Sequence, residues 1–204
     1  MKNTLVMVIV SFLITGCSAL GQRYGEEALY ATLFSDSDYE IRLYEPLVIA
    51  QTPAEGSYRQ ATRIGYQRLT AYVSGNNLAK QVISAGSSEN GAVSKAQLTT
   101  PYYEEFIDGI WLTSVAIPEK YSLATLPRPS NDLITFQVIP RIKTAVIGFS
   151  GIRTEGLINK KADQLLQWIK QEGLTETSAA RSVIFDTPMT LPGLNRHEIH
   201  ITVQ

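Results

Sequence analysis

The same order of strand-like and helix-like segments occurs twice along the chain, and this repeat constrains the fold more than any other feature of the sequence. The apolar segments Val48–Ala50 and Val146–Gly148 lie 98 positions apart, and so do Gly75 and Gly173, which follow the two helical segments. An offset that is shared by both ends of the two units indicates an internal duplication.

In the first unit, alternation with a period of two residues over 39–44 predicts a strand, and the apolar run 47–50 predicts a second strand after a kink or turn. Apolar residues then recur at three-to-four-residue spacing from after Gly56 to Val73, which predicts an amphipathic helix. A further strand is expected over 109–118. The unit therefore contains a helix between strands.

The second unit repeats this plan. Residues 136–139 and 145–148 predict two strands, and apolar positions over 158–169 share one face of a predicted helix. Strands are expected again over 181–185 and 197–203, with Ile199, Ile201 and Val203 on one face of the last strand.

Two such units predict an α+β fold, with a duplicated ββαββ-type unit that forms a distorted, mostly antiparallel β-barrel flanked by two helices. The composition, 44% hydrophobic and 18% charged, is that of a chain with a packed core. We expect a single domain over 39–204, because about 165 residues are enough for one core.

The N-terminus has the layout of a signal peptide. A lysine at position 2 precedes a nearly continuous apolar run from Leu5 to Ile14, and small residues lead to Cys17. About ten apolar residues are too few to span a bilayer, for which roughly 20 are needed. The sequence that ends at Cys17 resembles the lipobox of bacterial lipoproteins, in which the cysteine is acylated and becomes the mature N-terminus.

We therefore expect a signal peptide over 1–16, a lipidated tether over 17–38, and lipidation at Cys17. Two or more acyl chains hold a protein stably on a membrane. Ser18 stands where an aspartate would favour retention in the inner membrane, so the expected location is the cell envelope, at the outer membrane and facing the periplasm. An ordinary secretory signal with a chance cysteine is the alternative.

Charge and cysteine content restrict the function. The net charge is −1 and the basic residues do not cluster, which argues against binding to nucleic acid. Cys17 is the single cysteine, so once it is lipidated no disulfide, zinc-thiolate or iron–sulfur site can form within one chain.

Several motifs, in order and at matching spacing, resemble those of the SOUL/heme-binding protein family. They are Tyr39-Glu40-Ile41-Arg42 with Tyr44-Glu45-Pro46, Gly65-Tyr66-Gln67-Arg68-Leu69 through Gly75-Asn76-Asn77, Leu98-Thr99-Thr100-Pro101, Leu126-Pro127-Arg128-Pro129, Phe149-Ser150-Gly151 and Thr187-Pro188 through Asn195-Arg196-His197-Glu198-Ile199. The resemblance covers Tyr39 to Val203. It implies the same duplicated barrel with two flanking helices.

The resemblance also implies non-enzymatic binding of heme or another tetrapyrrole as cofactor or cargo, in an apolar groove beside the first helix. A porphyrin needs a flat apolar face, cations or hydrogen-bond donors for its propionates, and optionally an axial ligand. The expected tetrapyrrole-binding residues are Arg63, Tyr66, Leu69, Thr70 and Tyr102. Arg68 lies on the same helix and could also reach propionates, although a solvated helix face is the simpler interpretation of its arginines.

The axial ligand is left open. His197 is a weak candidate, and His200, three positions along the same predicted strand, should point to the opposite face. His197 stands where the family pattern has asparagine, so no ligand carries over to it, and a buried or exposed structural imidazole is the alternative. Tyr66 or Tyr102 could ligate ferric iron, although ordinary packing is the simpler interpretation of both residues.

No hydrolase, metalloprotease or phosphate-loop motif occurs, so we expect no enzyme. The adjacent Glu104 and Glu105 are interpreted as solvated. The polar segment 84–91 lengthens a connection that is shorter in the family, and it could cover the expected groove or merely extend a hairpin. Two other functions stay open: an envelope protein that binds another apolar small molecule, and a structural lipoprotein that binds a protein partner that the sequence does not identify.

Overall fold

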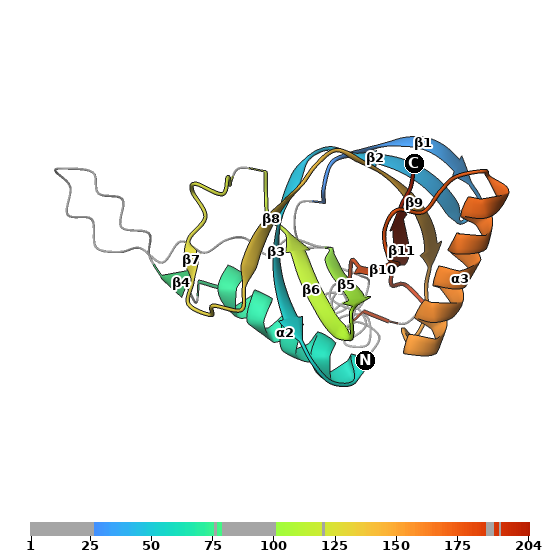
Figure 1. Ribbon diagram of the computed structural model, residues 1–204. Helices are drawn as coiled ribbons and strands as arrows, with labels where there is room; N and C mark the ends of the chain where they lie inside the picture. The colour runs from blue at the N-terminus through green and yellow to red at the C-terminus, as the bar shows by residue number, and fades with distance from the viewer. Residues whose placement is uncertain (1–26, 76, 79–100, 120, 187–189, 192) are drawn as a thin grey trace, which may run out of the picture.

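The computed structural model describes residues 27–75, 77–78, 101–119, 121–186, 190–191 and 193–204 (Figure 1). The expected signal peptide over 1–16, the expected lipidation site Cys17 and the segment 84–91 lie outside these residues. Within them, no helix is long and apolar enough to cross a membrane.

The main body is a nine-stranded antiparallel sheet that curls into a half-barrel, with two helices against its outer face (Figure 1). The helices are α2 (Tyr58–Val73) and α3 (Glu155–Gln171). The strands of the sheet are β1 (Tyr30–Asp36), β2 (Tyr39–Tyr44), β3 (Leu47–Ala54), β5 (Tyr102–Ile107), β6 (Ile110–Ala116), β8 (Thr135–Ile139), β9 (Ile142–Phe149), β10 (Arg181–Ile184) and β11 (His197–Thr202). Two short strands, β4 (Asn77–Leu78) and β7 (Arg128–Pro129), form a separate pair.

The strand order confirms the predicted fold class and the duplication. It runs β1-β2-β9-β11-β10-β5-β6-β3-β8. From β2 to β8 the order is symmetric about the central β10–β5 pair, because β2 corresponds to β8, β9 to β3, β11 to β6 and β10 to β5. The first strand of each unit pairs with the second strand of the other unit, β2 with β9 and β8 with β3. The two units are thus interleaved in one sheet.

The sheet begins earlier than the sequence pattern indicated. Residues Tyr30–Asp36, which we expected to belong to the tether, form β1 and pair antiparallel with β2. All seven residues of β1 are exposed, so neither face imposes the apolar alternation that reveals a half-buried strand. The prediction of a tether is therefore wrong for these residues.

Both predicted helices are confirmed, and local signals explain their ends. In α3, the Thr154 side chain accepts a hydrogen bond from the Leu157 N–H at 3.2 Å, which caps the first turn. Gly75 after α2 and Gly173 after α3 have φ of 103° and 69°. This left-handed conformation is accessible to glycine at little cost, and it ends a helix by turning the chain away.

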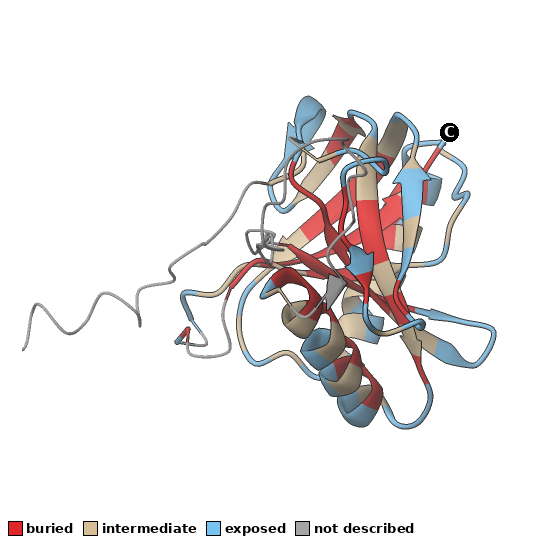
Figure 2. Cartoon of the chain, turned by 90° about the vertical axis from the view of Figure 1, so that its left-hand side faces the viewer, coloured by how far each residue is buried: buried red, intermediate tan, exposed pale blue. Residues whose placement is uncertain are grey.

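The core has three parts, and the buried residues gather in the strands (Figure 2). One cluster lies between α2 and the sheet around Leu69, Tyr72 and Val115, and a second lies between α3 and the sheet around Leu165, Ile169 and Ile199. A third, smaller cluster joins the inner-face residues Tyr103 and Val183 with Ala116, Phe185 and Leu47. Each helix thus covers its own part of the outer face, and the inner face is left to line the half-barrel.

Candidate functional site

The strip of sheet between the two helices brings together residues from both halves of the chain. Helix α2 packs on β3 and β6, and α3 packs on β9 and β11, so β5 and β10 lie between the two footprints. On these strands Tyr102 pairs with Ile184, Ile184 with His197, and His197 with Phe149. Paired residues on neighbouring strands point to the same side of a sheet. We call this row, together with Tyr66, the inter-helix face.

Three of the predicted site residues meet at one end of the inter-helix face. The rings of Tyr66 and Tyr102 have centroids 4.8 Å apart, and the hydroxyls of Thr70 and Tyr102 lie 3.3 Å apart. Tyr102 is buried, and burial raises the pKa of its phenol to about 12. Tyr66 is 38% exposed, so its ring presents an aromatic surface to whatever binds there.

The other predicted residues of α2 occupy different environments. Leu69 is fully buried in the core beneath α2 and has no surface to offer a ligand, so the structure removes it from the candidate site. Arg63 is exposed on the outer side of the helix. The Arg68 guanidinium donates to the Pro53 carbonyl at 2.6 Å and is therefore held against β3.

His197 and His200 point to opposite faces of the sheet, as predicted. His197 is on the inter-helix face, 5% exposed, with its ring centroid 5.5 Å from that of Phe149. Within the described part of the chain its Nδ1 atom is buried and has no hydrogen-bond partner. Burial, followed by the charge of Arg153, lowers the pKa of His197, so the imidazole is neutral near pH 7. A neutral imidazole nitrogen with a free lone pair is the form that ligates a metal.

Glu104 and Glu105 are not solvated, in contrast to the prediction. Glu104 is 4% exposed, forms an ion pair with Arg153 and accepts a hydrogen bond from the Tyr58 hydroxyl at 2.9 Å. Glu105 faces the other side of the sheet and pairs with Arg181 at 3.1 Å. Both basic partners are distant in sequence, which is why the local pattern could not reveal these ion pairs. Glu104 links α2, β5 and the segment before α3 at the border of the inter-helix face.

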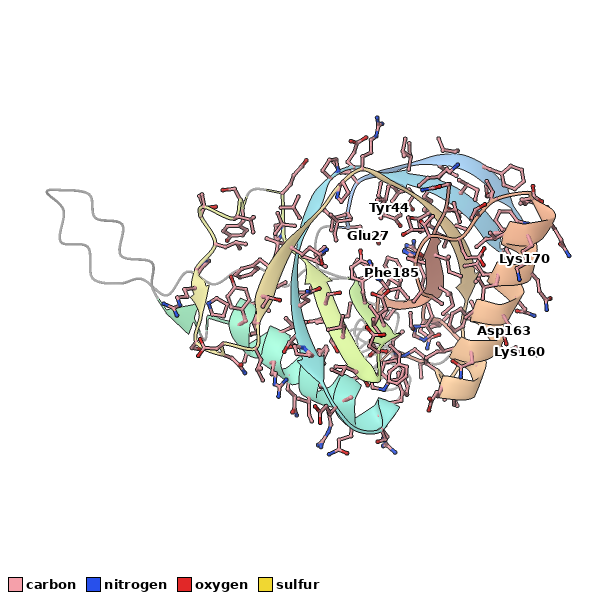
Figure 3. The ribbon with its side chains drawn as sticks, in the orientation of Figure 1. Glu27, Tyr44, Lys160, Asp163, Lys170 and Phe185 are labelled. Carbon is pink, nitrogen blue, oxygen red and sulfur yellow. The ribbon has the colours of Figure 1, made fainter. Side chains whose placement is uncertain are left out.

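The inner face of the half-barrel holds a buried ionic cluster that sequence reasoning missed. Glu198 is 2% exposed and accepts two hydrogen bonds from Arg42, at 2.7 and 3.0 Å. Its carboxylate also lies 2.7 Å from Arg196 Nη2 and 2.7 Å from His200 Nε2. Tyr44 and Phe185 lie inside the half-barrel near this cluster, as does Glu27 (Figure 3).

The protonation states of the cluster follow from its contacts. Burial alone would raise the pKa of Glu198, but the hydrogen bonds from His200 and Arg42 and the charge of Arg42 outweigh burial and hold the pKa well below its usual range. Burial lowers the pKa of His200, against the opposite effect of Glu198. His200 is therefore neutral near pH 7, and its Nε2 donates the proton that Glu198 accepts.

Two cavities adjoin this inner face. The inner cavity, lined by Tyr44, Tyr103 and His200 among others, has a volume of about 30 Å³, which is room for about one water molecule. The outer cavity has a volume of about 190 Å³, and its lining includes the apolar residues Leu29, Leu47, Val48, Ile117 and Val138 and the acidic residues Glu27, Glu45 and Glu119. Leu47 lines both cavities, so they are neighbours.

Comparison with solved structures shows which folds this architecture resembles. A hydrolase from Listeria innocua matches with a TM-score of 0.58 and 11% identity, covering 84% of this chain and 94% of that chain. The EcmrR C-terminal domain matches with a TM-score of 0.54 and 13% identity, covering 86% of this chain and 98% of that chain. At such identities the similarity shows the fold alone.

The remaining comparisons concern sequence. A search of curated proteins found no significant match. A family model described as SOUL heme-binding protein matches residues 25–202, which is most of the chain and includes the whole described sheet and both helices.

Proposed function

This chain belongs to the SOUL heme-binding protein family, and from that premise we propose that it is a lipid-anchored, non-enzymatic protein that binds heme or a related tetrapyrrole on the inter-helix face. The family suggests binding of heme or another small apolar ligand. The observation that carries the finer proposal is the inter-helix face itself, where the exposed ring of Tyr66 contacts the buried Tyr102, and a buried, neutral histidine with an unpaired nitrogen lies on the same face.

Each part of that face suits one part of a tetrapyrrole. The Tyr66 ring offers a flat apolar surface for the macrocycle, and the Thr70 hydroxyl beside Tyr102 offers a hydrogen bond. Arg63 on the exposed side of α2 supplies a cation that can reach a propionate. The Nδ1 atom of His197 is a possible axial donor to iron, and the Tyr66 and Tyr102 phenols are alternative donors.

A hemin titration followed by absorbance tests this proposal. We use the full chain with Cys17→Ser, and we expect a saturable 1:1 change in the Soret band. Tyr66→Ala should weaken binding about tenfold, equivalent to about 1.4 kcal/mol, because the aromatic surface is lost. Tyr30→Ala is the matched control, since Tyr30 is 36% exposed, close to the 38% of Tyr66, but lies on β1.

The same titration separates the alternatives. A Soret maximum that shifts in His197→Gln assigns the axial ligand to His197, and an unchanged maximum leaves that role to a phenol. If hemin produces no saturable change, the tetrapyrrole proposal is abandoned. A thermal shift with other apolar molecules but not hemin would then favour a different small ligand, and no shift at all would favour a protein partner.

The lipid anchor is proposed from the sequence alone. The apolar run that ends at Cys17 supports signal-peptide cleavage before this residue and acylation of its thiol, with the domain held at the outer membrane on its periplasmic side. Cells grown with labelled palmitate should incorporate the label into the wild-type protein and none into Cys17→Ser. Equal labelling of both proteins would rule out Cys17 as the acylated residue.

We also propose that the protein has no catalytic activity. The sequence lacks the nucleophile, metalloprotease and phosphate-loop motifs that carry common hydrolytic chemistry. The Listeria innocua neighbour is called a hydrolase, but that name concerns a protein of 11% identity, and similarity of fold does not transfer an activity.

A further inference from the structure

Glu27 and Arg196 connect the outer cavity with the ionic cluster of the inner face. Glu27 lines the cavity, and its two carboxylate oxygens lie 3.4 and 3.5 Å from Arg196 Nη1. Charge-assisted hydrogen bonds are normally about 2.7–2.9 Å long, so this contact is weak. The Glu27 side chain is also a third exposed, so little prevents it from rotating into solvent.

Arg196 is fixed in place whether or not Glu27 contacts it. Its Nε and Nη2 atoms bind Glu198 Oε1 at 2.9 and 2.7 Å, and its guanidinium lies 3.9 Å above the centroid of the Phe185 ring. These contacts use one edge and one face of the planar group. The Nη1 edge is left pointing toward Glu27, which makes it a preorganised donor for a carboxylate.

The lining of the cavity beside this donor is mostly apolar. Leu47, Val48 and Ile117 contribute side chains, and the more exposed Leu29 and Val138 also line it. An apolar space next to a fixed guanidinium matches a molecule that has a hydrocarbon body and one carboxylate. The carboxylate of such a ligand would take the position of the Glu27 carboxylate beside Arg196. One carboxylate would thus replace another there, so the charge of the cluster would not change.

We propose that the outer cavity is a binding site for a small amphipathic carboxylate, whose apolar body fills the cavity and whose carboxylate takes the place of Glu27 on Arg196. Glu27 is then an internal competitor that occupies the anion position when no ligand is bound. The lining of this cavity shares no residue with the inter-helix face, so this proposal does not depend on tetrapyrrole binding.

Three eight-carbon probes test the proposal by isothermal titration of the full chain with Cys17→Ser. Octanoate should bind saturably, and octanol and octylammonium, which have the same tail but no carboxylate, should bind at least about tenfold more weakly. Glu27→Gln should tighten octanoate binding about three- to tenfold, because the amide competes poorly for the guanidinium.

Glu45→Gln is the matched control. Glu45 also lines the cavity and its substitution removes the same charge, but its partner is Arg141, far out in solvent, so octanoate affinity should change little. Tyr66→Ala should leave octanoate binding unchanged, which separates this site from the inter-helix face. If Glu27→Gln does not fold, Glu27→Asp serves instead, because its carboxylate is one methylene farther from Arg196.

Three results would overturn the proposal. The first is no saturable binding of octanoate to wild type or to Glu27→Gln. The second is tighter binding of octylammonium than of octanoate, which would make the cavity a cation site that uses Glu27 as its anion. The third is an equal effect of Glu27→Gln and Glu45→Gln, which would reduce the role of Glu27 to its general charge.

Discussion

Glu198→Ala is expected to lower the free energy of unfolding by about 3–5 kcal/mol, because breaking a buried ion pair leaves its partner charged and desolvated. Arg42, only 3% exposed, would lose both of its bonds to Glu198, and Glu40, at 2.6 Å, would be left as its carboxylate partner. His200 would lose its acceptor and Arg196 its closest carboxylate. Urea unfolding followed by circular dichroism measures the loss.

The exposed ion pair between Glu45 and Arg141 provides the control. The side chains of Glu45 and Arg141 are 47% and 58% exposed, so Glu45→Ala should lower the free energy of unfolding by no more than about 1 kcal/mol. Glu198→Gln keeps the shape of the side chain and removes only its charge. Its loss of unfolding free energy should therefore lie between those of Glu45→Ala and Glu198→Ala. A loss for Glu198→Ala as small as that for Glu45→Ala would show that the buried cluster does not stabilise the fold.

Gly65→Ala is expected to destabilise the protein by about 2–3 kcal/mol, because overpacking a tight contact forces the surrounding structure to shift. A Cβ atom at Gly65 would lie 2.5 Å from Thr113 Cβ and even closer to Thr113 Oγ1. Helix α2 can therefore lie this close to β6 only with glycine at the contact. Thermal and urea unfolding of the variant measure the effect.

The second helix supplies the matched comparison. A Cβ atom at Gly156 in α3 would meet nothing within 4 Å, so Gly156→Ala should be neutral or stabilise by up to about 1 kcal/mol through helix propensity. In the double variant Gly65→Ala/Thr113→Ala the nearest clash is removed. The loss of unfolding free energy in this variant should therefore be smaller than the sum of the losses in the two single variants. Equal effects of Gly65→Ala and Gly156→Ala would show that close packing of α2 is not required.

The inter-helix face illustrates what could be predicted of the site. Tyr66, Thr70 and Tyr102 were predicted as binding residues, and the structure brings all three into contact. The sequence did not distinguish the core residue Leu69 from these three, because in a helix a ligand-facing position and a core-facing position can be adjacent in sequence. Sequence motifs directed the prediction to helix α2, but they could not say which of its side chains keep an exposed surface.

The sequence by itself determined the features that depend on near neighbours: both helices, most of the strands, the duplication and, through its motifs, the family. Side chains two, three or four residues apart share a face, so a buried face is visible in a short window of sequence. Strand β1 was not predicted, because neither of its faces is buried and its sequence therefore lacks this pattern.

Only the tertiary structure decided which distant residues meet. Arg42 and Glu198 are 156 positions apart, Glu104 and Arg153 are 49 apart, and Glu27 and Arg196 are 169 apart. The contact between Arg42 and Glu198 follows from the interleaving of the two units, in which β2 pairs with β9 and β9 with β11. Ion pairs of this kind have no sequence period, because the register between strands sets them, and that register is fixed only when the whole sheet packs against its two helices.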